Sequence, residues 1–133
     1  MNKPSFNALS DRTALVVDDD PDMCWVLKTT LELFDYSAAI AENGRQALRL
    51  SATRPFPIAF IDARLPDMDG LQLATVMHSK HKDLRIIIIS GFYSEDDLQI
   101  VEAAKTRRVQ AFLAKPFQID AIWEILKNME IDV

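Results

Sequence analysis

The sequence predicts an α/β fold in which a doubly wound parallel sheet carries helices on both faces. Five short apolar runs alternate with longer stretches of helical spacing, and the runs are 14–17, 38–41, 58–61, 86–89 and 109–113. Because no hairpin signal separates successive runs, each strand is expected to return through a helix and to pair in parallel. The runs at 58–61 and 86–89 lack alternating polar residues, which is typical of interior strands. The Ala-rich run at 38–41 predicts a weaker edge strand.

Apolar residues at helical spacing predict the helices between these strands. The clearest stripe is Met23, Val26, Leu27, Thr30, Leu31 and Phe34, and Asp20 and Pro21 before it are typical of an N-cap and a first helical position. Ser94 and Asp97 resemble a capping box ahead of Leu98, Val101 and Ala104. The last stripe is Ile122, Ile125, Leu126 and Met129, which follows the strand stop at Pro116.

Length and composition indicate one domain with its own core. The chain has 133 residues, of which 49% are hydrophobic, and a formal net charge of −5. The acidic balance argues against direct binding of nucleic acid, and the single Cys24 excludes an intrachain disulfide or a Cys-rich zinc site. No signal peptide or membrane-spanning run is present. We expect a soluble cytoplasmic domain over 13–131, with no membrane contact, after a flexible tail at 1–12.

Polar residues follow four of the five apolar runs. They are Asp18, Asp19 and Asp20 after the first, Asp62 after the third, Ser90 after the fourth and Lys115 after the fifth. The carboxyl ends of parallel strands share one edge of the sheet, where ligands bind. Clustered carboxylates need a counter-cation, and Mg²⁺ prefers carboxylates with water and a phosphate oxygen. Such a site suits phosphoryl transfer onto Asp62, with Lys115 neutralising charge and Ser90 donating a hydrogen bond.

Four motifs in order carry a family resemblance from about residue 13 to residue 129. They are LVVDDDPDM, FIDARLPDMDG, Ser90-Gly91 after four isoleucines, and FLAKPF. In combination they resemble the receiver domain of bacterial two-component response regulators. The fold that we expect is therefore flavodoxin-like, with strand order 2-1-3-4-5. The resemblance implies a signalling switch rather than a turnover enzyme, with at most slow self-dephosphorylation.

The resemblance also implies roles for individual residues. Asp62 would accept a phosphoryl group from a phosphohistidine on a sensor histidine kinase or a phosphotransfer protein. Mg²⁺ would be held by Asp18, Asp19, Asp62 and the backbone carbonyl of Arg64. Lys115 would pair with the phosphoryl group, Ser90 would be the hydroxyl switch, and the Lys115–Pro116 bond would be cis. Phe112 matches the aromatic position that follows the hydroxyl, although plain core packing explains it equally well.

Structural roles account for other conspicuous residues. Helix capping and the helix dipole explain Asp20 and Asp22, and a turn entering a helix explains Asp67 and Asp69. We expect His78 and His81 to be solvated residues at a helix end. Trp25 and Trp123 lie beside the apolar stripes and predict partly covered surface positions. By resemblance, the first helix is where phosphodonor proteins dock and the last helix belongs to the output face.

Two features depart from the family pattern. Ser90 and Lys115 lie 25 positions apart in the sequence, which predicts an enlarged loop at 91–95. The turn before the fifth strand has Arg108 where receivers usually have Gly. Both departures touch the fourth helix, and therefore the switch and the output face rather than the phosphoacceptor pocket.

Two other functions fit the sequence less well. An aspartyl-phosphate phosphohydrolase would need a second acid where this chain has Arg64. A calcium loop at DDDPDM would need Gly at Met23 and an acid at Thr29. Because the sequence ends at Val133, just beyond the last helix, we expect a free-standing receiver or one excised from a larger DNA-binding regulator or hybrid kinase. The sequence leaves open the effector and whether phosphorylation drives formation of a homodimer.

Overall fold

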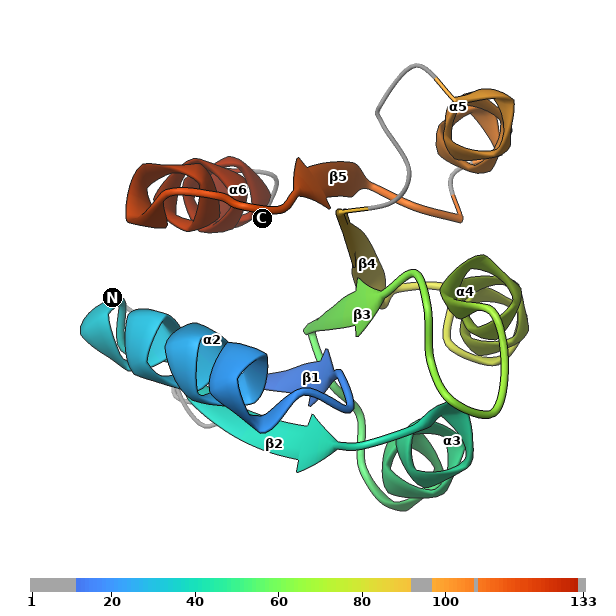
Figure 1. Cartoon of the computed structure of the whole chain (residues 1–133), viewed down its shortest axis with the longest axis horizontal. Helices are drawn as coiled ribbons and strands as arrows, with labels where there is room; N and C mark the ends of the chain where they lie inside the picture. Colours follow the sequence, from blue (N-terminus) through green and yellow to red (C-terminus); the bar gives the residue numbers. More distant parts are fainter. Residues whose placement is uncertain (1–11, 92–96, 107, 132–133) are drawn as a thin grey trace.

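The computed structural model describes residues 12–91, 97–106 and 108–131 (Figure 1). One five-stranded parallel sheet runs through this part of the chain in the order β2-β1-β3-β4-β5. The strands are β1 (Thr13–Val17), β2 (Ser37–Ala41), β3 (Ile58–Asp62), β4 (Arg85–Ser90) and β5 (Ala111–Ala114). The helices are α2 (Pro21–Leu33), α3 (Gly44–Thr53), α4 (Gly70–Lys80), α5 (Leu98–Lys105) and α6 (Ile119–Ile131). The predicted fold class and strand order are confirmed, and so is the edge position of the strand predicted at 38–41, which is β2.

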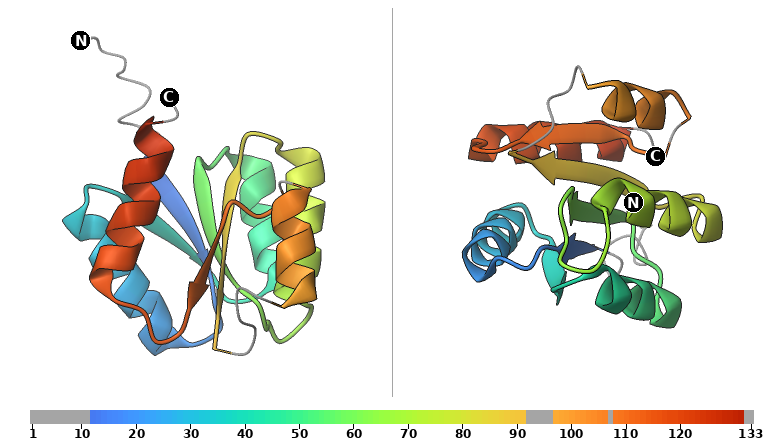
Figure 2. Two further views of the ribbon diagram at one scale, coloured as in Figure 1. Left: turned by 90° about the horizontal axis from the view of Figure 1, so that it is seen from above. Right: turned by 45° about the vertical axis from the view of Figure 1, so that its right-hand side comes forward.

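The helices cover both faces of the sheet, as Figures 1 and 2 show. Helices α2 and α6 pack on one face, over a core cluster that includes Val16, Leu27, Phe60, Ile87 and Leu126. Helices α3, α4 and α5 pack on the other face, over a cluster that includes Leu15, Ile61, Leu73, Ile88 and Ile100. Successive residues of a strand point to opposite faces, so the unbroken apolar runs of β3 and β4 supply both clusters.

Helix starts follow the sequence signals in the first part of the chain. Asp20 is the N-cap of α2, its side chain accepts a hydrogen bond from the Asp22 N–H, and Pro21 is the first helical residue. Asp69 caps α4 in the same way, through the Leu71 N–H at 2.7 Å. These oxygens satisfy N–H groups that the helix itself leaves unpaired. The capping roles predicted for Asp20 and Asp69 are therefore confirmed.

The capping box predicted at Ser94 is wrong in its position. The N-cap of α5 is Asp97, whose backbone is extended and whose carbonyl accepts from the Ile100 and Val101 N–H groups. The helix thus begins with Leu98, and Ser94 lies outside the described residues.

The fifth strand begins two residues later than predicted. The Val109 N–H donates to the carbonyl of Ala103 in α5, so its backbone is bonded to that helix and not to a neighbouring strand. Both the N–H and the side-chain carbonyl of Gln110 bond to the backbone of Ile86, and regular pairing starts at Ala111. Val109 is buried, which explains its apolar character without a place in the strand.

Some predictions fall on parts of the chain that the structure does not describe. The expected flexible tail at 1–12 is one of them, because only Arg12 of it is described. Of the enlarged loop expected at 91–95, only Gly91 is described. Among the helices of the described residues, none combines the length and hydropathy that a membrane span requires.

Candidate functional site

The predicted site residues meet at the carboxyl edge of the sheet. Asp18 directly follows β1, while Asp62 ends β3 and Ser90 ends β4. Strand register aligns these ends, because Val17 pairs with Ile61 and Asp62 pairs with Ile89. Lys115 follows β5, and its backbone N–H donates to the Ser90 carbonyl at 2.8 Å. Four strands therefore deliver their polar residues to one place.

Three carboxylates form a cluster at this edge. Asp18, Asp19 and Asp62 each offer one carboxylate oxygen, and these oxygens lie within 4.8 Å of one another. The side chains of Asp18 and Asp62 are 2% and 13% exposed, while Asp19 is exposed. Hard carboxylate oxygens at this spacing, with one open side, fit a divalent cation that keeps part of its water shell.

Lys115 places one ammonium group between the two inner carboxylates. Its Nζ lies 3.5 Å from Asp18 Oδ2 and 3.5 Å from Asp62 Oδ2. The Lys115 side chain is 25% exposed, so it approaches the cluster from the rim. One positive charge faces three carboxylates, which leaves the cluster negative at neutral pH.

The pKa of Asp18 is raised at this site. Burial, together with the charge of Asp62, raises the pKa of Asp18 to about 6. The hydrogen bond from the Asp20 N–H to Asp18 Oδ1 and the charge of Lys115 oppose the shift without cancelling it. A buried carboxylate that is costly to ionise is stabilised when a cation binds beside it.

The loop after β3 brings Arg64 next to the cluster. Its backbone N–H donates to Asp62 Oδ1 at 3.1 Å, and its side chain is exposed. The loop closes through the Gly70 N–H, which donates to the Ala63 carbonyl at 2.7 Å. A Cβ atom at Gly70 would collide with the Asp62 carbonyl oxygen, so only glycine permits this close return of the chain.

Ser90 and Phe112 lie on the same face of the sheet. Ser90 is 1% exposed at the end of β4, two residues beyond Ile88, which pairs with Phe112 of β5. Residues two apart on a strand share a face. Phe112 is half-buried and packs against the cluster beneath α3, α4 and α5. The Lys115–Pro116 peptide bond is cis, as the resemblance implied.

Sequence reasoning missed the main contact of Asp67. It was expected to be a turn residue, and its carboxylate instead accepts hydrogen bonds from the Gly44 and Arg45 N–H groups at 2.8 and 3.0 Å. These hydrogen bonds, the first in particular, lower the pKa of Asp67. The contact joins the loop after β3 to the start of α3, a pairing that no local sequence signal reveals.

The histidine prediction is wrong for His78. This residue is half-buried, and its Nδ1 is buried with no hydrogen-bond partner among the described residues. The polar end of α4 is therefore less solvated than its composition indicates. His81, also expected to be solvated, is half-buried too; it is the C-cap residue of α4 and donates its N–H to the Met77 carbonyl.

The two tryptophans lie on the surface, as predicted. Trp25 on α2 is 67% exposed and Trp123 on α6 is 41% exposed. The ring of Trp123 lies 4.9 Å from that of Phe34, at the end of α2. This contact joins the two helices on their face of the sheet.

The sequence and the structure each match known proteins. The sequence model of the response regulator receiver domain matches residues 14–127. The response regulator protein PilR of Pseudomonas aeruginosa is 31% identical over 118 residues, which is 89% of this chain and 26% of PilR. A CheY-like receiver domain protein from Methanospirillum hungatei superimposes with a TM-score of 0.80 at 26% identity, covering 91% of this chain and 98% of that one. The response regulator TrrA of Thermotoga maritima, solved with Mg²⁺ and BeF, has a TM-score of 0.77 at 28% identity, over 88% of this chain and 97% of that one.

A doubly wound parallel sheet with an acidic cluster and a lysine at its carboxyl edge is the architecture that these comparisons share with a signalling domain. The chain belongs to the response regulator receiver domain family of two-component signal transduction. It spans about a quarter of the length of the curated relatives that it matches, such as PilR.

Proposed function

We propose that residues 13–131 form a receiver domain in which Asp62 accepts a phosphoryl group. The donor is a phosphohistidine on a sensor histidine kinase or a phosphotransfer protein in the cytoplasm. The domain acts as a switch, with at most slow self-dephosphorylation. It signals through protein contacts to an effector, without binding nucleic acid or a membrane itself.

The observation that carries this proposal is the surroundings of Asp62. Its carboxylate ends an apolar strand and lies beside two other acids and the ammonium group of Lys115. An acid in that position has no helix to cap, unlike Asp20 or Asp69. A nucleophile beside one fixed cation and a potential metal site is what phosphoryl transfer requires.

These groups suffice for transfer of the phosphoryl group from the phosphohistidine to Asp62. A carboxylate oxygen of Asp62 attacks the phosphorus, the P–N bond of the phosphohistidine breaks, and the imidazole nitrogen keeps the electron pair and later takes up a proton. Lys115 neutralises charge on the phosphoryl oxygens, and the Ser90 hydroxyl donates a hydrogen bond to one of them. An acyl phosphate on Asp62 results.

The acidic cluster fits Mg²⁺ as the cofactor. Asp18, Asp19, Asp62 and the backbone carbonyl of Arg64 would hold the ion, which prefers a few carboxylates, water and phosphate oxygens. When bound, Mg²⁺ supplies Lewis-acid neutralisation of the phosphoryl oxygens.

The switch would start at Ser90 and reach the face formed by α5, β5 and α6. Once Ser90 and Lys115 engage the phosphoryl group, the population of conformations shifts at the end of β4, and Phe112 follows on the same face of the sheet. The curated relatives include transcriptional regulators such as NtrC of Escherichia coli. We therefore propose that this receiver domain controls the activity of a transcriptional regulator of that kind.

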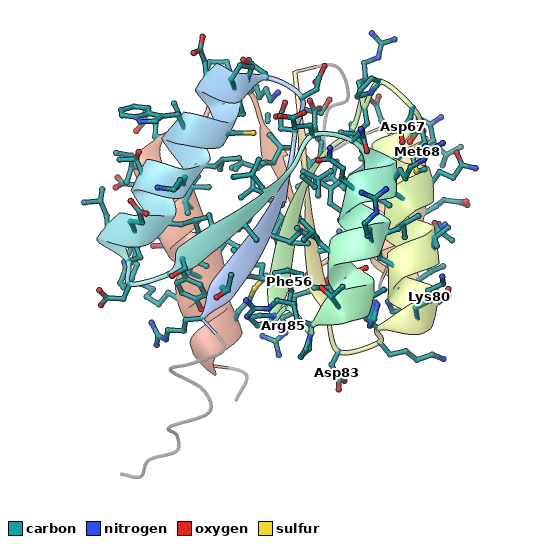
Figure 3. All side chains as sticks on the ribbon, turned by 90° about the horizontal axis from the view of Figure 1, so that it is seen from below. Phe56, Asp67, Met68, Lys80, Asp83 and Arg85 are labelled. Carbon is teal, nitrogen blue, oxygen red and sulfur yellow. The ribbon has the colours of Figure 1, made fainter. Side chains whose placement is uncertain are left out.

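Intact-mass measurement with a small phosphodonor tests the proposal. With Mg²⁺, the wild-type protein should gain one phosphoryl group, and removal of Mg²⁺ with a chelator should prevent this. Asp62→Asn should gain none, while Asp83→Asn should label like the wild type, because Asp83 is exposed at the opposite edge of the sheet (Figure 3). Undiminished labelling of Asp62→Asn would refute the assignment. Size measurement before and after labelling shows whether phosphorylation drives dimerisation.

A further inference from the structure

The loop between β3 and α4 is closed on itself by backbone hydrogen bonds. At its base, the Gly70 N–H donates to the Ala63 carbonyl at 2.7 Å. Above that bond, Arg64 and Asp69 form an isolated antiparallel bridge, and the Leu65 N–H donates to the Met68 carbonyl at 3.3 Å. The backbone of Arg64 is thus part of a compact turn that is closed by its own hydrogen bonds.

The tip of this turn is attached to α3, a helix that begins 18 residues earlier than Asp62 in the sequence. Asp67 accepts from the N–H groups of Gly44 and Arg45. Met68 packs against Gly44 so closely that a Cβ atom there would lie 2.6 Å from the Met68 sulfur. Figure 3 shows Asp67 and Met68 side by side at this end of the molecule.

The start of α3 uses two separate caps. Asn43, the N-cap residue, accepts from the Gln46 N–H at 2.8 Å through its side chain. Asp67 accepts from the two N–H groups that come before Gln46 in the helix, those of Gly44 and Arg45. An isolated helix end would leave these two to water. Asn43 therefore caps the helix locally, whereas Asp67 caps it from the loop that carries Arg64.

From this arrangement we infer that Asp67 is a positioning residue for the metal site. By fixing the tip of the turn to α3, its carboxylate holds the backbone of Arg64 beside Asp62, whose Oδ1 accepts from the Arg64 N–H at 3.1 Å. Residues that orient metal ligands without touching the metal change affinity when they are removed. This inference rests on the proposed function, because it takes Arg64 as one of the ligands of Mg²⁺.

Calorimetric titration with MgCl₂ of the full chain tests the inference. Asp67→Ala should lower the affinity for Mg²⁺ about 10-fold, the lower end of the range for residues that support metal ligands. Asp67→Asn keeps one of the two acceptor oxygens and should give an intermediate loss. Asn43→Ala is the matched control, since it also removes a cap from α3 but leaves the loop attached, and its affinity should stay within about twofold.

Amide hydrogen exchange supplies a second reading on the same proteins. Exchange at Arg64 and Leu65 should accelerate in Asp67→Ala and stay unchanged in Asn43→Ala. Wild-type affinity in Asp67→Ala would overturn the inference, and so would an equal loss of affinity in Asn43→Ala, because the effect would then come from the stability of α3. Failure of the wild-type protein to bind Mg²⁺ would instead overturn the proposed function.

Discussion

Arg108 donates a hydrogen bond from its Nη1 to the hydroxyl oxygen of Thr75 at 2.9 Å and so joins the turn before β5 to helix α4. Its Nε donates to the Thr106 hydroxyl at 2.7 Å, and its backbone N–H donates to the Ala103 carbonyl at the end of α5. The residue that stands where receivers usually have Gly therefore ties the end of α5 to α4.

Removing this tie should destabilise the end of α5. Arg108→Ala should lower the free energy of unfolding by about 1–2 kcal/mol, because the variant removes two hydrogen bonds from a charged donor to hydroxyl groups at a partly exposed site. Amide exchange at Thr106 and Val109, whose N–H groups bond to α5 carbonyls, should accelerate. Urea denaturation and hydrogen exchange measure these two effects.

Thr75→Val provides the control for that change. The Thr75 hydroxyl also donates to the Leu71 carbonyl within its own helix, so the variant loses a local bond as well. Combining it with Arg108→Ala should cost less than the sum of the two single changes, since both remove the same contact. Strict additivity would show that the Arg108–Thr75 bond contributes nothing to stability.

Asp18 should destabilise the metal-free protein at neutral pH. Its pKa is raised to about 6 by burial and by Asp62, so the folded state binds a proton more tightly than the unfolded state, where the pKa is near 4. The contribution of Asp18 to stability is thus favourable at low pH and is lost as pH rises from about 4 to about 6. Asp18→Asn should therefore raise the free energy of unfolding by about 2–3 kcal/mol at pH 7, in the presence of a chelator.

The pH profile and the metal separate this effect from a general change in packing. The difference in stability between Asp18→Asn and the wild type should shrink as pH falls toward 4. Mg²⁺ should stabilise the wild type and have little effect on Asp18→Asn, because ligand binding stabilises only a state that can bind it. A constant difference at all pH values would contradict the electrostatic explanation.

The sequence predicted the sheet and the cluster for one physical reason. Parallel strands have their carboxyl ends on one edge, so residues that follow apolar runs must converge there. Asp62, Ser90 and Lys115 could be placed together because each directly follows or ends such a run, and the register of β3, β4 and β5 aligns them. Local capping signals were equally reliable at Asp20, where the partner lies two residues away.

Contacts between segments far apart in the sequence were not predictable in this way. Asp67 resembles any turn acid, and its role depends on α3 reaching the same loop in space. Arg108 was predicted only from its immediate neighbours, whereas its environment includes Thr75 of α4, 33 residues away in the sequence. A single sequence carries no signal for such pairings, since either partner alone has an ordinary surface explanation.

Gly70 should be essential for the loop that follows Asp62. An added Cβ at this position would meet the Asp62 carbonyl oxygen and the backbone of Ala63, neither of which can move without distorting the site. Gly70→Ala should therefore lower the free energy of unfolding by about 3 kcal/mol or more. Gly91→Ala is the control, because the nearest atom to a Cβ there is Lys115 Cβ at an ordinary 3.6 Å. Denaturation midpoints of the two variants distinguish these outcomes.

The two surface tryptophans should differ in their importance for stability. The Trp123 ring lies 4.9 Å from Phe34, at a tilt of 35°, and so helps to hold α6 against the end of α2. Trp123→Ala should cost about 1–2 kcal/mol, from the aromatic pair and the area it covers. Trp25 is 67% exposed, and Trp25→Ala should change stability by no more than about 0.5 kcal/mol. Urea denaturation of both variants checks this difference. If Trp25→Ala cost as much stability as Trp123→Ala, the Trp25 side chain would have to make packing contacts that its high exposure argues against.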